Sequence, residues 1–361
     1  MSQEPIVIVG AGILGLTTAL TLAENLPQAQ ITVVAEWGPH NPQMNASMTN
    51  SNEYTSPWAG AHFRPFPSAS KKDQEEMQMT RVTMNHFRHV AETNPESSIQ
   101  FCDGVEYLQS PSELYKSCAP GYCEGMSNFT KLDDKREFCG FKYDTWVVNP
   151  PVYLQYLYRK LLIEHHVNFL CVKLTSLAEV NNYVSGRPIV VNCSGSGLRY
   201  YGGVDPKYIP VRGQTLLINP PRDCPYVNQT VTYQLGDGSW IFIIPRPLNG
   251  GFILGGTKQV GDTYLGVRQR DTEHLMKLGK QYFPGLMKTD ARSGQSYFDV
   301  MRINVGLRPG RCGGLNTELE KHNGQYVVNN YGAGGMGYEL SYGSSLKVLS
   351  TVNDLLNKSK L

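Results

Sequence analysis

The chain has 361 residues, of which 40% are hydrophobic and 18% are charged, and its formal net charge is +2. This length suits two domains that share an interface, and the small net charge gives no field for binding nucleic acid. No apolar run approaches the roughly 18 residues of a membrane span, and the first residues lack the regions of a signal peptide. We therefore expect a soluble protein, made in the cytosol, that acts on a small molecule without a nucleic-acid or membrane partner.

The eight cysteines are scattered along the chain and form no C-x-x-C pair. This spacing favours reduced thiols over a disulfide framework or a zinc site. We therefore expect no bound metal.

The first segment of the chain predicts a nucleotide site. Residues 6–9 predict a buried strand, and residues 13–26 predict a helix that follows a tight turn. In the G-x-G-x-x-G pattern of this turn, the glycines allow a sharp bend, a close approach to a pyrophosphate and close packing of helix on strand. The start of the helix supplies N–H groups to the diphosphate. The six residues of the turn are Gly10, Ala11, Gly12, Ile13, Leu14 and Gly15.

A second predicted strand, "QITVVAE", ends at Glu36. An acidic side chain at this point accepts hydrogen bonds from the adenosine ribose and argues against a 2′-phosphate. The start of the chain therefore predicts a bound dinucleotide, and the turn itself leaves FAD and NAD open.

The rest of the chain predicts a second sheet inserted between parts of the nucleotide fold. Helical patterns occur at 71–93 and 152–166, and a further strand with a glycine turn occurs at 188–203. Apolar segments between Gly and Pro residues predict an antiparallel sheet, and they occupy 211–221, 238–257 and 296–310. The chain closes with a strand, a glycine loop and a helix.

We therefore expect an α/β (α+β) fold in which a Rossmann-like domain of separated segments is interleaved with a substrate domain on an antiparallel or mixed sheet. The nucleotide-binding domain is predicted at 1–66, 152–203 and 304–361. The substrate-binding domain is predicted at 67–151 and 204–303.

Two further motifs are candidates for binding chemistry. Arg308 lies among glycines and a proline in "GLRPGR", and the arginine fork suits a carboxylate through two parallel hydrogen bonds. The glycine-rich segment "YGAGGMGYE" precedes a helix, so its backbone can approach a ligand closely. A surface salt bridge and a flexible turn are the structural alternatives. No nucleophile elbow, P-loop or H-E-x-x-H motif occurs, which fits chemistry carried by a cofactor.

Nine motifs resemble, in family order across nearly the whole chain, the D-amino-acid oxidase and D-aspartate oxidase flavoenzymes, particularly those of yeasts and fungi. They are "VIVGAGILGL", "YTSPWAGA", "VVNCSG", "PVRGQT", "IIPRP", "LGGT", "VGLRPGR", "NYGAGGMGYE" and the terminal "SKL". The resemblance implies two interleaved domains and FAD bound without a covalent link. It also implies that a D-amino acid and dioxygen are converted to a 2-oxo acid, ammonia and hydrogen peroxide.

The resemblance also implies a role for individual residues. The turn Gly10 to Gly15 and Glu36 are expected to hold the adenosine diphosphate half of FAD. Further cofactor contacts are expected from Thr55, Ser56, Gly60, Ala61, Leu174, Ser194 and Gly195. The loop expected to meet the flavin ring comprises Gly334, Gly335, Met336, Gly337, Tyr338 and Glu339. Arg308 resembles the arginine that binds the substrate carboxylate, and Gly335 resembles the residue whose carbonyl receives the amino group.

One position departs from the family pattern. The family usually has a tyrosine just before "IIP" whose hydroxyl meets the substrate carboxylate, and this chain has Phe242. The contact is then absent or comes from elsewhere, with Tyr233, expected on a loop, as a candidate.

The segment that follows "SPWAGA" bears on the choice of substrate. Neutral-substrate yeast relatives commonly carry uncharged residues where this chain has His62 and Arg64. A second cation there would pair with a side-chain carboxylate, so we expect D-aspartate or D-glutamate as substrate. A neutral or broad-specificity oxidase remains the alternative, followed by a glycine- or sarcosine-type amine oxidase or a dehydrogenase.

The last three residues, Ser359, Lys360 and Leu361, match the peroxisomal address that is read at a free carboxyl terminus. We therefore expect the peroxisomal import receptor as a partner and the peroxisome matrix as the location. The sequence is compatible with a homodimer.

Overall fold

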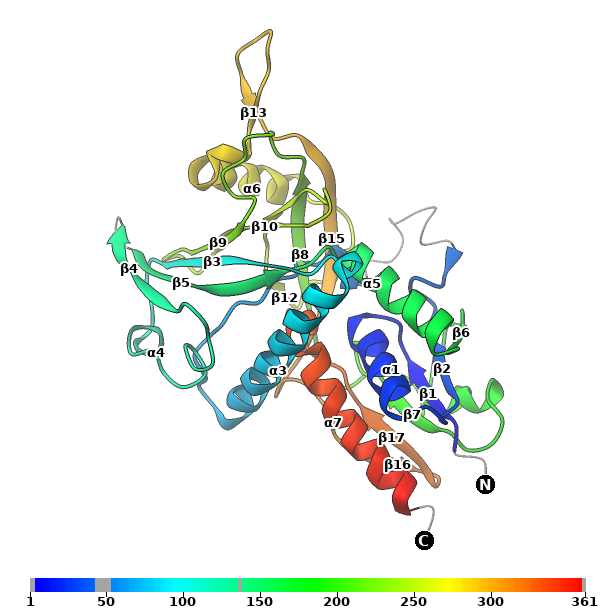
Figure 1. The fold of residues 1–361 in the computed structure, drawn as a ribbon. Coiled ribbons are helices and arrows are strands. Elements are labelled where there is room, and N and C mark those ends of the chain that lie inside the picture. Colours follow the sequence, from blue (N-terminus) through cyan, green and yellow to red (C-terminus); the bar gives the residue numbers. More distant parts are fainter. Residues whose placement is uncertain (1–3, 43–52, 136–137, 359–361) are drawn as a thin grey trace.

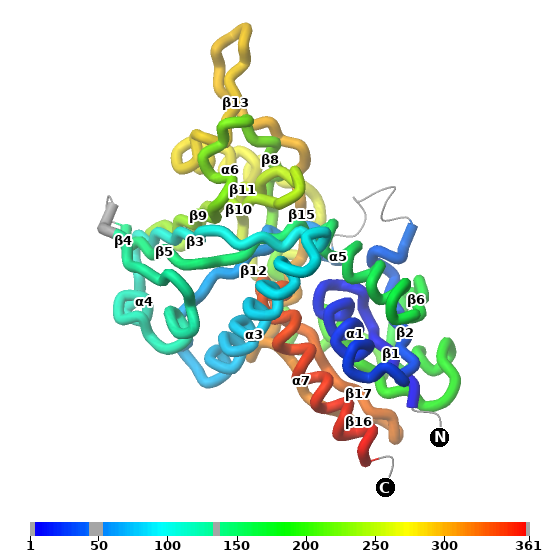
Figure 2. Tube along the Cα trace, viewed as in Figure 1, coloured from blue at the N-terminus to red at the C-terminus, as the bar shows by residue number. Residues whose placement is uncertain are grey.

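The computed structural model describes residues 4–42, 53–135 and 138–358. Within these ranges the chain forms two lobes, each built on its own sheet (Figure 1). Both described ends of the chain lie in the lobe of the smaller sheet (Figure 2). The last three residues, and with them the predicted peroxisomal address, lie outside the described residues.

The smaller sheet has the doubly wound pattern that the first motif predicts. Its strands follow the order β16-β17-β7-β1-β2-β6 and are parallel except for β16, which pairs antiparallel with β17. The central strands are apolar and fully buried, as strands covered on both faces must be. The strands are β1 (Ile6–Val9), β2 (Ile31–Val34), β6 (Asn168–Leu170), β7 (Ile189–Asn192), β16 (Leu319–His322) and β17 (Gln325–Asn329).

Four helices pack into the core of this lobe, namely α1 (Ile13–Asn25), α3 (Lys71–Thr93), α5 (Pro150–Arg159) and α7 (Gly337–Lys358). Helix α7 lies against α1, where the hydroxyls of Thr21 and Ser345 are 2.7 Å apart. It also lies beside α3, because an added Cβ on Gly343 would collide with the backbone of Met79 (Figure 1). The described helices include none that is long and apolar enough to cross a membrane.

The larger sheet follows the order β12-β8-β11-β10-β9-β3-β5-β4, and β15 pairs antiparallel with β8. Helix α6 (Gln269–Tyr282) packs against one face of this sheet, and the hairpin of β13 (Lys288–Thr289) and β14 (Ser296–Tyr297) projects beyond it (Figure 1). The strands are β3 (Gln100–Leu108), β4 (Thr130–Lys135), β5 (Phe138–Val147), β8 (Tyr208–Ile218), β9 (Gln229–Gln234), β10 (Trp240–Pro245), β11 (Phe252–Gly255), β12 (Gln259–Val260) and β15 (Val300–Arg311). The short helix α4 (Glu113–Lys116) lies between β3 and β4.

The two faces of the larger sheet have different roles, since side chains alternate along each strand. Ile241 and Ile243 of β10 point to the core under α6. Phe242 and Ile244 of the same strand pack with Ile253 on the opposite face. We call this opposite face the site face.

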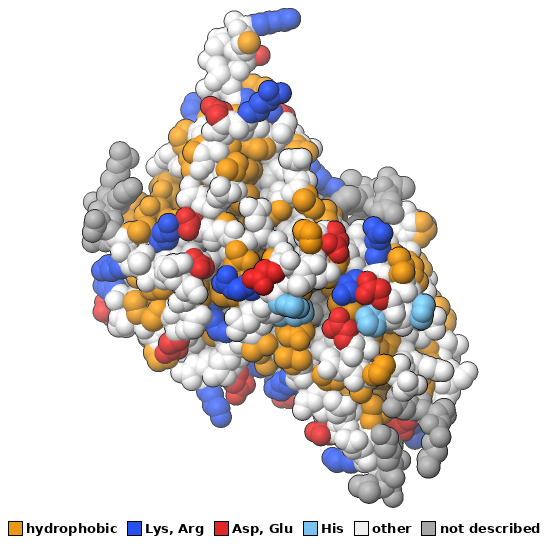
Figure 3. All heavy atoms as spheres, in the orientation of Figure 1, with side chains coloured by type: hydrophobic (Ala, Val, Ile, Leu, Met, Phe, Trp, Pro, Cys, Tyr) orange, Lys and Arg blue, Asp and Glu red, His pale blue; other side chains and the backbone are white. Residues whose placement is uncertain are grey.

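The predicted fold class is confirmed, and two boundaries of the predicted segments differ from the structure. Strand β15 stays in the larger sheet as far as Arg311, so 304–311 pair with β8 rather than with the nucleotide sheet. Helix α3, placed in the substrate segment, packs with the nucleotide lobe. Basic and acidic side chains are interspersed on the face drawn in Figure 3, in agreement with the small net charge.

Candidate active site

The glycine turn between β1 and α1 has the close backbone packing that its pattern requires. Gly10 has φ +108°, and an added Cβ would collide with the carbonyl oxygen of Cys193 at the end of β7. An added Cβ on Gly15 would collide with the carbonyl oxygen of Gly10. Only glycine fits at these two positions, and the turn therefore brings α1 close to the ends of two parallel strands.

The segment 54–61 is fixed against this turn by side-chain hydrogen bonds. The N–H of Ile13 donates to the Ser56 hydroxyl at 3.0 Å, and the Tyr54 hydroxyl donates to the Ala11 carbonyl at 3.0 Å. The hydroxyl of Tyr338, in the first turn of α7, donates to the Ser56 carbonyl at 3.0 Å. Three of the segments predicted to contact the cofactor therefore meet at the start of α1.

Arg246, which sequence reasoning missed, connects the same segment to the larger sheet. Its Nη2 donates to the carbonyls of Ala59 at 2.7 Å and Pro57 at 3.1 Å. Gly60 follows Ala59 in the chain, and an added Cβ there would come within 2.8 Å of Ile244. The "SPWAGA" segment is thus held between the nucleotide lobe and the site face.

The glycine loop before α7 lies beside the end of β7. The N–H of Gly332 donates to the carbonyl of Gly195 at 3.1 Å, and Gly195 has φ +75°. Ser194 donates its hydroxyl to the side chain of Asn192 at 2.7 Å. The predicted backbone contributors Ser194 and Gly195 therefore lie next to the loop that is expected to meet the flavin.

Glu36 and Leu174 follow β2 and β6, the last two strands at one side of the smaller sheet. The Glu36 carboxylate is 3.3 Å from the ammonium of Lys173, which is 70% exposed, and such surface pairs contribute little to stability. Leu174 packs against the apolar cluster beneath β1 and β7. The carboxylate that is predicted to meet the ribose therefore lies at the partly exposed end of β2.

Arg308 lies on β15, opposite Val211 of β8, and its side chain lies on the site face. Its guanidinium covers Gly213, where an added Cβ would come within 2.6 Å of Nη2, and its Nη1 donates to the Thr257 carbonyl at 3.1 Å. Burial lowers the pKa of Arg308 to about 10, so the group stays cationic at neutral pH. No acidic side chain of the described residues forms an ion pair with it.

The glycine loop reaches this arginine. The N–H of Gly334 donates to the carbonyl of Pro309 at 2.9 Å, and an added Cβ on Gly335 would lie 3.7 Å from the Arg308 side chain. The structure therefore brings the predicted carboxylate-binding arginine and the predicted amine-binding loop together.

Phe242 of β10 lies on the site face, and β11 separates it from β8. An added Cβ on Gly255 would lie 2.6 Å from the Phe242 ring and 2.9 Å from the methyl group of Thr215. The buried Thr215 Oγ1 and Asn304 Nδ2, which lie opposite each other on β8 and β15, have no hydrogen-bond partner. These unpartnered polar atoms lie on the same face as Arg308, and buried polar groups without a partner in the protein are candidates for a hydrogen bond to a ligand or water.

Tyr233 is not placed to replace the missing hydroxyl, and this corrects the expectation for that residue. Tyr233 pairs with Ile241 and so points to the α6 side of the sheet. Its ring stacks on Tyr107 at 4.9 Å and packs against Tyr282 at 4.6 Å. The hydroxyl is therefore on the opposite face from Phe242, because side chains alternate along a strand.

His62 and Arg64 lie between the "SPWAGA" segment and the larger sheet. His62 forms a bridge with Val147, and its Nδ1 is buried without a partner. Burial, with a smaller contribution from Arg64, lowers the pKa of His62 to about 3, so the imidazole is neutral.

The charge of Arg64 is compensated within the protein, which differs from the expected role as a binder of the substrate side chain. Its Nη1 lies 2.6 Å from Oε1 of Glu106, whose side chain is 0% exposed. Gln234 donates to the same carboxylate at 2.5 Å, and Tyr122 donates to it at 3.4 Å. Burial alone would lower the pKa of Arg64, but the Glu106 carboxylate raises it overall. Arg64 is thus one half of a buried ion pair.

Lys258 is a second cation near the site face, besides Arg246, that sequence reasoning missed. Its ammonium lies 5.7 Å from the centre of the Trp240 ring, and the Arg64 guanidinium lies 5.8 Å from the same ring. Trp240 donates its indole N–H to the Gly256 carbonyl at 2.6 Å, next to the Thr257 carbonyl that Arg308 uses. Across the described ranges, Lys258 has no carboxylate in ion-pair contact.

Signals for two of the missed residues exist in the sequence. Trp240 lies two positions before Phe242, so strand alternation places the two rings on one face. Lys258 directly follows the "LGGT" motif. Glu106 is a charged residue in an otherwise strand-like run, and nothing in the sequence connects it to Arg64, which is 42 positions away.

Glu339, in the first turn of α7, is a buried carboxyl group of the predicted flavin loop. Its Oε1 accepts the backbone N–H of Arg64 at 2.9 Å. Burial raises its pKa to about 7, against opposing effects of the Arg64 N–H and the Arg64 and Arg81 charges. Glu339 therefore connects the flavin loop to the segment that carries His62 and Arg64.

These residues fit FAD. Gly10, Gly12 and Gly195 are partly exposed, as the close approach of a diphosphate requires, and the unpartnered Thr215 and Asn304 groups lie on the same face as Arg308. Bound FAD supplies an acceptor for a hydride. No cluster of three or more His, Cys, Asp or Glu side chains suited to a metal occurs in the described part of the chain.

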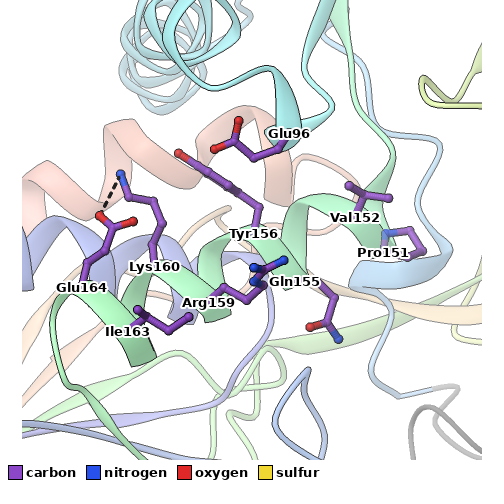
Figure 4. Close-up of a pocket in the computed structure, with 9 residues that line it drawn as sticks. All are labelled: Glu96, Pro151, Val152, Gln155, Tyr156, Arg159, Lys160, Ile163 and Glu164. Carbon is purple, nitrogen blue, oxygen red and sulfur yellow. Dashed lines mark ion pairs between the residues drawn. The ribbon is translucent and has the colours of Figure 1, made fainter.

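A hollow of about 660 Å³ lies along α5 and is separate from this site (Figure 4). It is lined by one face of the helix, including Tyr156 and Lys160, and by Glu96. None of the residues that surround Arg308 lines it.

Comparison with known proteins agrees with this geometry. The family model described as FAD dependent oxidoreductase (DAO) matches residues 5–348. A D-aspartate oxidase from Talaromyces thermophilus is 35% identical over 96% of this chain and 94% of its own length. A D-amino-acid oxidase from Schizosaccharomyces pombe is 35% identical over 94% of each chain.

Solved structures of the same fold cover nearly the whole chain. The L-proline dehydrogenase from P. horikoshii aligns with a TM-score of 0.70 at 15% identity, over 98% of this chain and 94% of its own. The glycine oxidase from Geobacillus kaustophilus aligns with a TM-score of 0.69 at 17% identity, over 99% and 95%. The chain therefore belongs to the DAO family of FAD-dependent oxidoreductases, and its cofactor is FAD.

Proposed function

We propose that the protein is a D-amino-acid oxidase, which converts a D-amino acid and dioxygen to an imino acid and hydrogen peroxide. Water then converts the imino acid to a 2-oxo acid and ammonia. The observation that carries this proposal is Arg308, a buried cation on the site face whose guanidinium donates, among the described residues, only to the Thr257 carbonyl. The names of the two 35% identical relatives support it.

The residues of the site suit a reaction that depends on positioning. The Arg308 guanidinium binds the α-carboxylate through two hydrogen bonds, and the carbonyl of the adjacent Gly335 accepts a hydrogen bond from the amino group. The two contacts fix the Cα–H direction, and holding reactants in this way supplies a large part of the rate. Burial of Arg308 strengthens its attraction for the carboxylate because water no longer screens it.

We further propose that acidic D-amino acids are the preferred substrates and that Lys258 binds their side-chain carboxylate. Arg64 is paired with Glu106 and His62 is neutral, so neither offers a net charge. Lys258 lies over Trp240, close to the carbonyl that Arg308 uses. The name of the Talaromyces thermophilus relative supports the acidic preference.

A neutral substrate is the second candidate, and the aromatic surface of Trp240 and Phe242 favours it. Their rings are 5.9 Å apart on the site face and offer an apolar contact to an uncharged side chain. The two candidates differ in whether the charge of the substrate side chain contributes to binding.

A peroxide assay with matched substrates separates them. We expect higher kcat/KM for D-Asp than for the isosteric D-Asn in the wild type, and loss of that difference in Lys258→Met. Lys277→Met, on the exposed part of α6, is the control and should leave the ratio unchanged. A wild type that prefers D-Asn, D-Ala or D-Met would refute the acidic preference, and an unchanged ratio in Lys258→Met would refute the role of Lys258.

The same assay tests the reaction class. Glycine, sarcosine and an artificial electron acceptor in place of dioxygen are added to the panel. Turnover of D-amino acids with peroxide release is expected. Activity only with secondary amines, or only with the artificial acceptor, would instead indicate an amine oxidase or a dehydrogenase.

The terminal Ser359, Lys360 and Leu361 support a further proposal, import into the peroxisome by its receptor. A fluorescent protein fused to the amino terminus should mark peroxisomes, and deletion of the three residues should release it to the cytosol.

A further inference from the structure

A largely buried ion pair lies next to the glycine loop, outside the residues already assigned to FAD or substrate. Arg311 donates from Nε to Oδ2 of Asp205 at 2.7 Å, and the two side chains are only 12% and 10% exposed. The Tyr331 hydroxyl donates to the same carboxylate oxygen at 2.8 Å, and Asn316 donates to that hydroxyl at 2.8 Å. We call these four residues the Asp205 cluster.

The carboxylate at the centre of the Asp205 cluster is ionised at neutral pH. Burial alone would raise the pKa of Asp205, but hydrogen bonds from Arg311, from the Lys207 N–H and from Tyr331 lower it overall. Hydrogen bonds to an ionised group are about twice as strong as those between neutral groups. The cluster therefore holds its members in one arrangement.

The Asp205 cluster joins three segments that reach the candidate active site. Asp205 lies in the loop between β7 and β8, which also carries Gly195. Arg311 is the last residue of β15, the strand that carries Arg308. Tyr331 directly precedes the glycine loop. The cluster thus connects the start of this loop to the strand of the predicted carboxylate-binding arginine.

The glycine loop needs such a contact because glycine restricts the backbone so little. Gly332 and Gly334 have φ of +84° and +57°. The Arg311 side chain packs directly on Gly332, where an added Cβ would come within 2.8 Å of it. The hydrogen bond from Gly334 to Pro309 then carries the position of the loop to the residue next to Arg308.

We propose that Asp205, Arg311 and Tyr331 are positioning residues that set the Gly335 carbonyl relative to the Arg308 guanidinium. A substrate that contacts both groups requires a fixed separation between them, because a displacement of about 1 Å can cost about 100-fold in rate. Arg308 itself is held by the pairing of β15 with β8. The role of the Gly335 carbonyl rests on the proposed function, whereas the contact between the cluster and the loop does not.

Tyr331→Phe removes one hydroxyl from the Asp205 cluster, and Tyr200→Phe is its matched control. Both tyrosines are buried, at 5% and 7% exposure. Tyr200 donates its hydroxyl to Gln325 at 3.0 Å, at the start of β17 and away from the glycine loop. Each variant loses one buried hydrogen bond, so a role confined to folding would affect the two alike.

Two measurements on the FAD-loaded proteins separate the loop from the arginine. A peroxide assay with D-aspartate gives kcat/KM. Titration with succinate, which is D-aspartate without its amino group, gives Kd from the flavin absorbance. D-alanine and propionate replace this pair if the neutral substrate is preferred.

We expect Tyr331→Phe to lower kcat/KM by about tenfold, because a shift of a fraction of an ångström costs less than a full ångström does. The Kd for succinate should stay at the wild-type value, since succinate has no amino group to meet the Gly335 carbonyl. Tyr200→Phe should change neither quantity.

Hydrogen exchange gives a readout that needs no turnover. The N–H groups of Gly332 and Gly334 both donate hydrogen bonds. We expect them to exchange faster in Tyr331→Phe than in the wild type, and at the wild-type rate in Tyr200→Phe. Asp205→Asn keeps the size of the side chain but removes its charge, and it should also speed this exchange. It serves as the second test if Tyr331→Phe fails to fold.

Three results would overturn the proposal. They are an unchanged exchange rate of the loop in Tyr331→Phe, an unchanged kcat/KM, and a loss of succinate affinity as large as the loss of kcat/KM. The last result would mean that the cluster acts on Arg308 and not on the loop. If the wild type oxidises no D-amino acid while the loop exchanges as expected, the oxidase proposal fails and the positioning of the loop stands.

Discussion

Replacing Glu106 by glutamine tests whether Arg64 depends on an internal counterion. Glu106 is 0% exposed and lies 2.6 Å from Arg64, whose side chain is 20% exposed. Removing one partner of a buried ion pair costs about 3–5 kcal/mol, because the other charge stays buried without compensation. Glutamine can still accept the hydrogen bond from Gln234, and Arg64 keeps some contact with water. We therefore expect Glu106→Gln to lower the free energy of unfolding by about 3 kcal/mol, at the lower end of that range.

The chain offers a matched control for this substitution. Glu113 forms an ion pair with Lys116 at 2.7 Å, almost the same distance, but the two side chains are 86% and 52% exposed. Exposed pairs contribute about 0–1 kcal/mol, since water and salt screen them. Glu113→Gln makes the same chemical change and should lower the free energy of unfolding by no more than that.

Urea unfolding at saturating FAD measures both variants, with the cofactor concentration held fixed because bound FAD adds its own stabilisation. The double variant Arg64→Leu with Glu106→Leu should recover part of the loss, because it leaves no unpaired charge. Equal losses in Glu106→Gln and Glu113→Gln would refute the reasoning. A double leucine variant whose loss in free energy of unfolding exceeds the summed losses of the two single leucine variants would also refute it.

The remaining predictions concern Arg308 and Glu339. Arg308→Ala should raise KM for the amino acid greatly while the protein keeps its bound FAD. Arg308→Lys should recover only part of the lost affinity, because an ammonium group lacks the two parallel donors of a guanidinium. An unchanged kcat/KM in Arg308→Ala would contradict the assignment of Arg308 to the substrate carboxylate. Burial raises the pKa of Glu339 from 4.5 to about 7, so the native state binds the proton more tightly than the unfolded state, and stability should fall by about 3 kcal/mol as pH rises from 4.5 to 7. Glu339→Gln should lose this part of the pH dependence in urea unfolding at pH 5 and pH 8, and equal slopes in both proteins would contradict the buried carboxyl.

Local patterns predict the parts of the fold that depend on neighbours in sequence. The strand, turn and helix around Gly10 are predictable because the glycine spacing itself determines the backbone geometry. The second sheet is predictable as a class, since Gly and Pro residues separate its apolar segments. The end of β15 at Arg311 is not, because it depends on pairing with β8, which is about 100 residues earlier.

The position of a side chain on a sheet requires the register between strands. Tyr233 is near Phe242 in sequence and carries the wanted hydroxyl, yet it pairs with Ile241 and points to the α6 side. A shift of one residue would have placed it on the site face. Sequence proximity therefore suggested Tyr233 as a loop residue near Phe242, whereas the structure places it on β9, on the opposite face of the sheet.

The charges of the site show the same limit in electrostatic terms. The sequence reveals Arg64 and Lys258 as two cations, but their effect on a substrate depends on which carboxylates lie beside them. Two unit charges 4 Å apart interact by about 4 kcal/mol at an effective dielectric constant of 20, enough to decide substrate choice. Glu106 cancels this attraction for Arg64, and no described carboxylate cancels it for Lys258. The proposal of an acidic substrate therefore rests on the exposed lysine, whereas the arginine is one half of a buried ion pair.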